Sequence, residues 1–141
     1  MKIAIGNDHA GYEYKEEVKK FLKSKCIEVV DCGCNSLDSC DYPIYGKAVA
    51  QMVANKEVDY GIVMCSTGEG IAITANKVKG VRCGIAYSDD TARLIRQHNN
   101  CNMIAFGASY MKLEDVKRRI EIFLTTTFDG GRHERRVNEI E

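Results

Sequence analysis

The clearest indication of the fold is the region that begins with Gly61-Ile62-Val63-Met64 and continues through Cys65 into Ser66-Thr67-Gly68-Glu69-Gly70. Its first half is an unbroken apolar run, which is typical of a parallel strand that is covered on both faces. Its second half is a glycine-bearing turn, and residues 71–77 then predict a short helix. A strand, a tight turn and a helix in this order indicate one βα unit.

The same alternation extends from this unit toward both ends of the chain. Short apolar runs predict further strands at 2–6, 28–31, 81–86 and 103–106, and amphipathic patterns predict helices at 14–25, 45–55, 89–98 and 112–125. Pro43 suits the first turn of the helix at 45–55. Five strands alternating with helices predict an α/β fold, a Rossmann-like three-layer αβα architecture with a five-stranded parallel sheet.

Composition narrows the class of protein. The 141 residues are enough for one domain spanning 1–141, and 45% hydrophobic residues argue against a disordered chain. Twenty Lys and Arg balance twenty Asp and Glu, which argues against broad nucleic-acid binding, and no apolar run is long enough for a membrane span. Seven cysteines without a signal-peptide pattern predict free thiols in the cytoplasm. Cys32, Cys34 and Cys40 lack ordinary zinc-ligand spacing, so we expect no metal site there.

Ligands of such sheets bind beyond the carboxyl ends of the strands. This rule selects Asn7-Asp8-His9, residues 65–70 and Ser88, which are expected on one rim. Asp8 and His9 then have two interpretations. Either Asp8 caps the following helix while His9 is solvated, or both face a ligand.

The turn after Cys65 has a chemical interpretation of its own. Backbone N–H groups that lead into a helix can hold an anion, and the same positive end favours the thiolate of Cys65, which could take a proton from carbon. The turn is neither a Walker A loop nor a dinucleotide fingerprint. The alternative is a tight turn around a buried thiol. Glu69 would oppose an anion unless it points away, and it could itself serve as a base.

Two polar clusters lie further along. His98-Asn99-Asn100-Cys101-Asn102 ends a predicted helix, where asparagines either form a C-cap or contact a polyhydroxylated ligand. The segment 128–141 begins with a basic, glycine-bearing stretch. Its surplus of positive charge is confined to residues 128–136, which hold three arginines and two acidic residues. If the segment is helical, Arg132 and Arg136 share one face and could bind a phosphate; the alternative is a solvated tail.

Together these clusters resemble the type B ribose-5-phosphate isomerase family, which includes galactose-6-phosphate isomerase subunits and allose-6-phosphate isomerases. The resemblance covers nearly the whole chain. It rests on Gly6-Asn7-Asp8-His9-Ala10-Gly11, Asp41-Tyr42-Pro43, Cys65-Ser66-Thr67-Gly68-Glu69-Gly70 with Ala75-Asn76-Lys77, His98-Asn99, and Gly130-Gly131-Arg132-His133 with Arg136.

The resemblance implies aldose–ketose isomerisation of ribose 5-phosphate through a cis-enediolate, without metal or cofactor. Cys65 matches the base that moves a proton between C1 and C2, and His98 matches the residue that assists ring opening. The full implied set is, for catalysis, Asp8, Cys65, Thr67 and His98 and, for substrate binding, His9, Tyr42, Ser66, Gly68, Glu69, Gly70, Asn99, Arg132 and Arg136. The resemblance implies a phosphosugar as ligand and a homodimer or homotetramer whose subunits share active sites. It implies no nucleic-acid or membrane partner.

Three positions depart from the family pattern. Many members have glycine at position 66 and an uncharged residue at position 69. The glutamate base of members without the cysteine corresponds to Ile71, so Glu69 is not that residue. Ser109 stands where many members have an arginine that reaches the neighbouring subunit's phosphate, which predicts a raised KM.

The sequence is also compatible with three other functions. A hexose 6-phosphate isomerase would use the same chemistry on a longer sugar. A flavodoxin-like ligand-binding or thiol redox module is disfavoured, because the chain has no Cys-x-x-Cys. An inactive subunit is disfavoured because Cys65 and His98 are both present.

Overall fold

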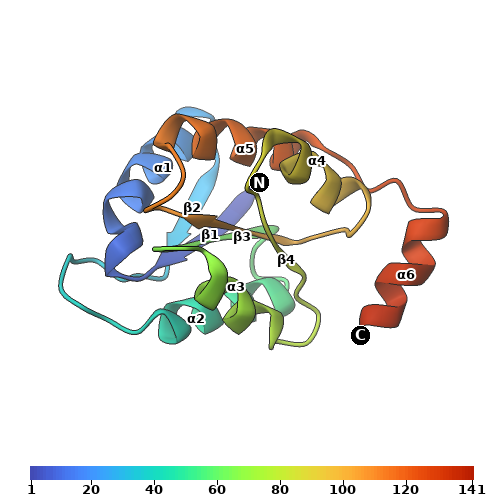
Figure 1. Cartoon of the computed structure of the whole chain (residues 1–141), viewed down its shortest axis with the longest axis horizontal. Coiled ribbons are helices and arrows are strands. Elements are labelled where there is room, and N and C mark those ends of the chain that lie inside the picture. The colour runs from blue at the N-terminus through green and yellow to red at the C-terminus, as the bar shows by residue number, and fades with distance from the viewer.

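The computed structural model describes residues 1–141 and contains one sheet of five parallel strands (Figure 1). The order across the sheet is β2-β1-β3-β5-β4. The strands are β1 (Lys2–Asn7), β2 (Glu28–Asp31), β3 (Tyr60–Cys65), β4 (Cys83–Ile85) and β5 (Met103–Gly107). Every predicted strand is therefore present, although β4 is shorter than the range that the sequence predicted.

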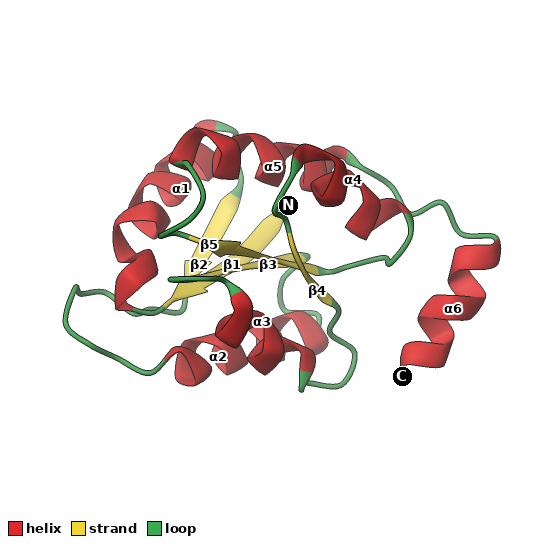
Figure 2. Ribbon diagram, in the orientation of Figure 1, coloured by secondary structure: helices red, strands yellow, loops and turns green.

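Helices cover both faces of the sheet. They are α1 (Tyr12–Ser24), α2 (Tyr42–Ala54), α3 (Glu69–Asn76), α4 (Asp89–Gln97), α5 (Leu113–Thr125) and α6 (Arg132–Ile140), with a short 3-10 helix at His9–Gly11. Figure 2 shows α2 and α3 packed together below the sheet and α1, α4 and α5 above it. This arrangement confirms the predicted three layers. None of these helices is long and apolar enough to cross a membrane.

Side chains along the central strands alternate between two cores. In β3, Ile62 and Met64 join the core under α1, α4 and α5, whereas Val63 and Cys65 join the core under α2 and α3. All four residues are at most 4% exposed. The unbroken apolar run of this strand thus has the predicted cause, since both of its faces are covered.

The end of the chain forms a helix in the segment that carries Arg132 and Arg136. In Figure 1, α6 stands to one side of the molecule, beyond α4. Val137 is its one buried residue, so α6 lacks the apolar stripe by which a helix is recognised. Its last turn is held by an ion pair of 3.3 Å between Arg82 and Glu141.

The strand order reverses direction between β1 and β3. The chain passes from β1 to one neighbour, β2, and then returns to the other side of β1 as β3. Asn7 at the end of β1 lies in register with Met64, the residue before Cys65. The connections that leave β1 and β3 therefore start side by side at the carboxyl edge, where such sheets bind ligands.

Candidate active site

Cys65 is the last residue of β3, and its side chain faces the α2–α3 layer. The residue is 4% exposed, so the interpretation as a buried thiol holds for the isolated chain. The backbone N–H of Gly68 donates to its Sγ at 3.2 Å. A sulfur that accepts a backbone N–H just before a helix N-terminus is placed to carry negative charge.

The turn that supplies this donor depends on glycine. Gly68 has φ +85°, a left-handed conformation. A Cβ at this position would lie 2.9 Å from the carbonyl carbon of Phe106, a backbone atom of β5. Within the turn, the Thr67 Oγ1 accepts from the Glu69 N–H at 3.1 Å. The turn is therefore wedged against the end of β5, which fixes the Gly68 N–H next to Cys65.

Asp8 and His9 lie at the adjoining end of β1. The Asp8 carboxylate accepts from the backbone N–H groups of Ala10 and Gly11 at 3.0 and 3.3 Å. The backbone N–H of Asp8 donates to the Met64 carbonyl at 3.2 Å. The capping interpretation of Asp8 is thus correct, and the same contacts place Asp8 beside the end of β3. Both bonds use Oδ1, so the second oxygen of this carboxylate is not engaged by the cap.

His9 is oriented by a contact that the sequence did not signal. Its Nδ1 accepts from the backbone N–H of Cys40 at 3.2 Å. That bond assigns the proton of a neutral His9 ring to Nε2, which becomes the donor for a ligand. Because the donor is a backbone group, no residue type at position 40 could have predicted this contact.

The loop that carries Cys40 is anchored by a buried lysine. Lys15 is fully buried, and its Nζ donates to Asp31 at 3.1 Å and to the Cys34 carbonyl at 2.6 Å. Burial by itself raises the pKa of Asp31, but hydrogen bonds from Lys19, the Gly33 N–H and Lys15 outweigh it, and the net pKa is lowered. This ion pair holds the start of the loop at the rim.

Tyr42 begins α2 and packs on the start of α3. A Cβ added to Gly70 would lie 2.5 Å from Cζ and 2.9 Å from the hydroxyl of Tyr42. The ring therefore occupies the space that a side chain at position 70 would need. This contact explains why a glycine and a tyrosine that are 28 positions apart both belong to the predicted site.

Two of the departures from the family pattern touch each other. The hydroxyls of Ser66 and Ser109 are 2.8 Å apart, and the Ser109 N–H donates to the Ser66 carbonyl at 3.0 Å. The third departure, Glu69, is exposed and lines a groove between α3 and α4. Its side chain thus lies outside the turn around Cys65.

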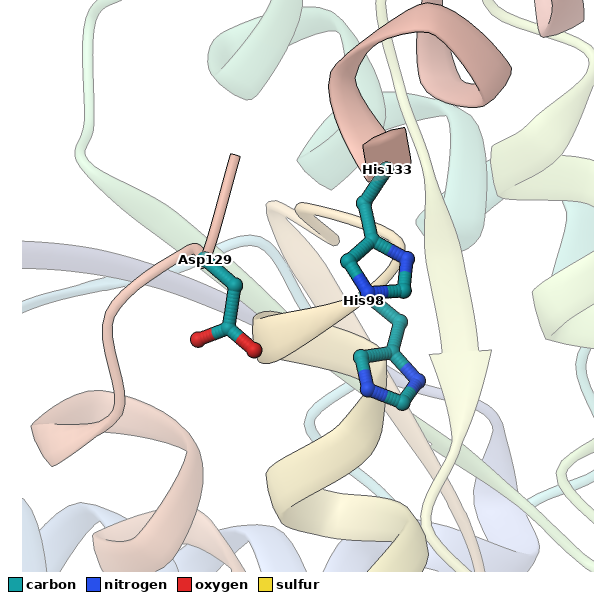
Figure 3. Close-up of side chains that lie close together, drawn as sticks. All are labelled: His98, Asp129 and His133. Carbon is teal, nitrogen blue, oxygen red and sulfur yellow. The ribbon is translucent and has the colours of Figure 1, made fainter. Parts of the chain in front are cut away.

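The remaining predicted residues lie at the opposite edge of the sheet. Because β4 points toward the carboxyl edge, α4 starts there at Ser88 and runs back to the amino edge. His98 is its C-cap, and Asn100 has the left-handed φ of +46°, which supports the C-cap interpretation of this cluster. Figure 3 shows His98 beside His133 of α6. One chain therefore does not bring His98 to Cys65.

Asn99 and the two arginines belong to this second group. The Asn99 carbonyl accepts from Arg82, which precedes β4 at the amino edge. Arg132 and Arg136 lie one turn apart on α6, both are exposed, and neither has a carboxylate within 4.0 Å. The segment is thus helical, which is the condition under which Arg132 and Arg136 share one face. The guanidinium groups of these two arginines are available to bind an anion.

A groove of about 580 Å³ between α3, β4 and α4 runs between the two edges. Its lining includes Glu69 and Tyr87 near the carboxyl edge and His98 and Asn99 near the amino edge. Ile73 and Tyr87 are 60% and 70% exposed. Large apolar side chains around a groove indicate a surface that binds another molecule.

Other thiols are poorly suited to act as a base. Burial raises the pKa of Cys32 and of Cys83 and raises that of Cys101 to about 11. Burial and the neighbouring thiol of Cys34 raise the pKa of Cys40 to about 11. Each of these shifts favours the protonated thiol, and a thiol that keeps its proton cannot accept one from carbon.

Comparisons with known proteins agree with the resemblance. The sequence profile of the Ribose/Galactose Isomerase family matches residues 3–140. Ribose-5-phosphate isomerase B of Escherichia coli is 43% identical over 139 residues, which cover 99% of this chain and 93% of the relative.

Solved structures give the same result. Ribose-5-phosphate isomerase B of Clostridium thermocellum superposes with a TM-score of 0.98 at 44% identity, covering 99% of this chain and 95% of that one. The enzyme of Mycoplasma genitalium, solved with bound ribulose 5-phosphate, superposes with a TM-score of 0.95 at 39% identity, covering 99% and 93%. The chain belongs to the Ribose/Galactose Isomerase family.

Proposed function

We propose that this protein interconverts ribose 5-phosphate and ribulose 5-phosphate. The main support for the proposal is the position of Cys65 in a chain of this family. Its Sγ lies at the carboxyl end of β3 and accepts a hydrogen bond from the Gly68 N–H at 3.2 Å. The relative with bound ribulose 5-phosphate supports a five-carbon substrate. The seven free cysteines support a reducing compartment, the cytoplasm.

In this reaction Cys65 removes the proton from C2 of the open-chain aldose. The electrons of that bond form the C1–C2 double bond of a cis-enediolate, and negative charge develops on O1. N–H groups of the turn and the Thr67 hydroxyl stabilise this charge. A proton then moves from the C2 hydroxyl to O1, the same sulfur returns the first proton to C1, and the carbonyl forms at C2. Atoms and electrons therefore balance without an oxidant or reductant.

A complete site requires a second copy of the chain. Asp8, His9, Tyr42 and Cys65 belong to the carboxyl edge, whereas the ring-opening and phosphate-binding candidates belong to the amino edge. We infer that two copies pack through the α3–α4 groove. His98, Asn99, Arg132 and Arg136 of one copy then complete the rim of the other. A two-fold dimer supplies two such sites.

Complementation between two inactive variants tests the shared site. Cys65→Ala and His98→Asn are each expected to be inactive alone. In a randomly mixed population, half of the dimers contain both variants, and one of the two sites in each is intact, so activity recovers to about a quarter of wild type. If both residues serve the site of their own chain, no mixed dimer has an intact site and activity stays absent.

A substrate panel tests the choice of sugar. Ser66 and Ser109 place two hydroxyls at the rim where many relatives have glycine and arginine, which favours a hexose 6-phosphate as the second candidate. Purified protein assayed with ribose, allose and galactose phosphates separates the two candidates. We expect the highest kcat/KM with ribose 5-phosphate, and a higher value for a six-carbon sugar would reassign the substrate.

A further inference from the structure

Three side chains that can bind metals meet at the amino edge. His98 is the C-cap of α4, Asp129 lies between α5 and α6, and His133 is in the first turn of α6. Each offers one ligand atom, and these atoms all lie within 4.8 Å of one another. Figure 3 shows the Asp129 carboxylate directed toward the two imidazoles. The imidazole rings stack with centroids 4.2 Å apart and an interplanar angle of 10°.

The backbone around this cluster is anchored. The Asp129 N–H donates to the Gln97 carbonyl at 3.0 Å, which ties the segment to the end of α4. The Arg96 Nε donates to the Thr126 carbonyl at 3.3 Å, and the His133 N–H donates to Gly130 at 3.1 Å. The three side chains are therefore held close together by their backbones.

None of the three side chains is engaged elsewhere. The two imidazoles and the Asp129 carboxylate form no hydrogen bond, and no cation lies within 4.0 Å of that carboxylate. The ligand atoms of all three side chains are therefore free to bind an ion.

We propose that His98, Asp129 and His133 bind a divalent transition-metal ion such as Zn²⁺, and that the bound ion inhibits the isomerase. Two imidazoles and one carboxylate are a ligand set that Zn²⁺ uses in proteins. The ion occupies the His98 nitrogen that ring opening needs. The inhibitory half of the proposal rests on the proposed function, whereas the binding half does not.

The geometry defines a weak and reversible site. A metal lies in the plane of each imidazole that binds it, so one of the two stacked rings must turn about χ2, a torsion with broad preferences. Ligand atoms of tetrahedral zinc are about 3.4 Å apart, given metal–ligand distances of about 2.1 Å, so the three groups must also move closer. The guanidinium groups of Arg132 and Arg136 oppose a second positive charge. The site therefore senses excess metal and does not hold a permanent ion.

Calorimetric titration of the full-length protein with zinc chloride tests binding directly. We expect one ion per chain, and Asp129→Asn should weaken the affinity at least about tenfold while leaving activity without metal unchanged. Asp38→Asn is the matched control, because it makes the same change at an exposed carboxylate of the loop that carries Cys34 and Cys40. Equal affinities of wild type and Asp129→Asn would overturn the proposal, and so would the absence of binding.

Cobalt distinguishes this site from a thiolate site. With Co²⁺, the three proposed ligands give weak visible bands and no sulfur-to-cobalt charge-transfer band; an intense near-ultraviolet band would assign the ion to cysteine and refute the proposal.

Saturating Zn²⁺ should reduce the isomerase activity of wild type at least about tenfold and that of Asp129→Asn much less. If the protein binds zinc through Asp129 but isomerises no sugar, the metal site stands and the proposed function is refuted. If the protein is an active isomerase but binds no zinc, the proposed function stands and the metal site is refuted.

Discussion

Replacing Cys65 with serine removes the proposed base with little change in the site around it. The serine hydroxyl can still accept the Gly68 N–H that now points at Sγ, at 3.2 Å in the native protein. Because the serine hydroxyl keeps the Gly68 N–H as a partner but buries an O–H donor, we expect a stability loss of about 1–3 kcal/mol. A serine hydroxyl does not ionise near neutral pH. The kcat should therefore fall about 10²- to 10⁴-fold, equivalent to about 2.7–5.4 kcal/mol of activation free energy, with KM little changed.

Exchange of the C2 proton with solvent measures this step directly. In deuterium oxide, the wild-type enzyme should replace the C2 proton of ribose 5-phosphate with deuterium, which proton NMR follows as the loss of that signal. Cys65→Ser should lose both exchange and ketose formation. Cys32→Ser is the matched control, since its half-buried thiol contacts Met52. If Cys65→Ser exchanges the proton at more than about a tenth of the wild-type rate, the base is another group, and Glu69→Gln is the next variant to test.

Three further variants test the binding, positioning and electrostatic arguments. Arg136→Ala should raise KM for the phosphosugar and make KM less dependent on salt, as initial rates at several ionic strengths will show; an unchanged KM would exclude α6 from the phosphate site. Gly70→Ala should displace the Tyr42 ring and raise KM, while urea denaturation shows a midpoint near that of wild type, because alanine favours the helix and the ring is partly exposed. The pKa of Asp31 is lowered in the folded state, so the ionised carboxylate stabilises the folded protein. This contribution is fully present above the unfolded pKa of about 4, and it is lost as the pH falls through the lowered folded pKa. Urea denaturation should therefore find Asp31→Asn less stable than wild type at pH 7 and the gap smaller at pH 3, and a gap that widens with acid would contradict this assignment.

The fold was predictable because its signals are local. Apolar runs of five strands and amphipathic patterns between them are visible within windows of about ten residues. The helix α6 was not predictable in this way. It buries only Val137, and its ends are held by distant groups, His98 at one end and Arg82 at the other. Contacts between residues far apart in sequence leave no periodic pattern.

The candidate site was predictable in part. The rule that ligands bind beyond the carboxyl ends of strands correctly brought Asp8 and Cys65 together. The same rule places His98 elsewhere, because a helix that follows a strand returns to the amino edge and its C-cap must lie there. The predicted order of elements already contained this separation. The backbone contact from Cys40 to His9 and the buried anchor Lys15 left no such signal.

The pair formed by Ser66 and Ser109 shows why departures from a family pattern should be interpreted together. In the sequence, position 66 lacks a common glycine and position 109 lacks a common arginine, and the two positions are 43 residues apart. In the structure, their hydroxyls are hydrogen-bonded at 2.8 Å and their backbones at 3.0 Å. A residue at either position therefore has the residue at the other as its neighbour. The two serines are therefore one change in the rim, and the missing arginine alone does not argue against a phosphosugar substrate.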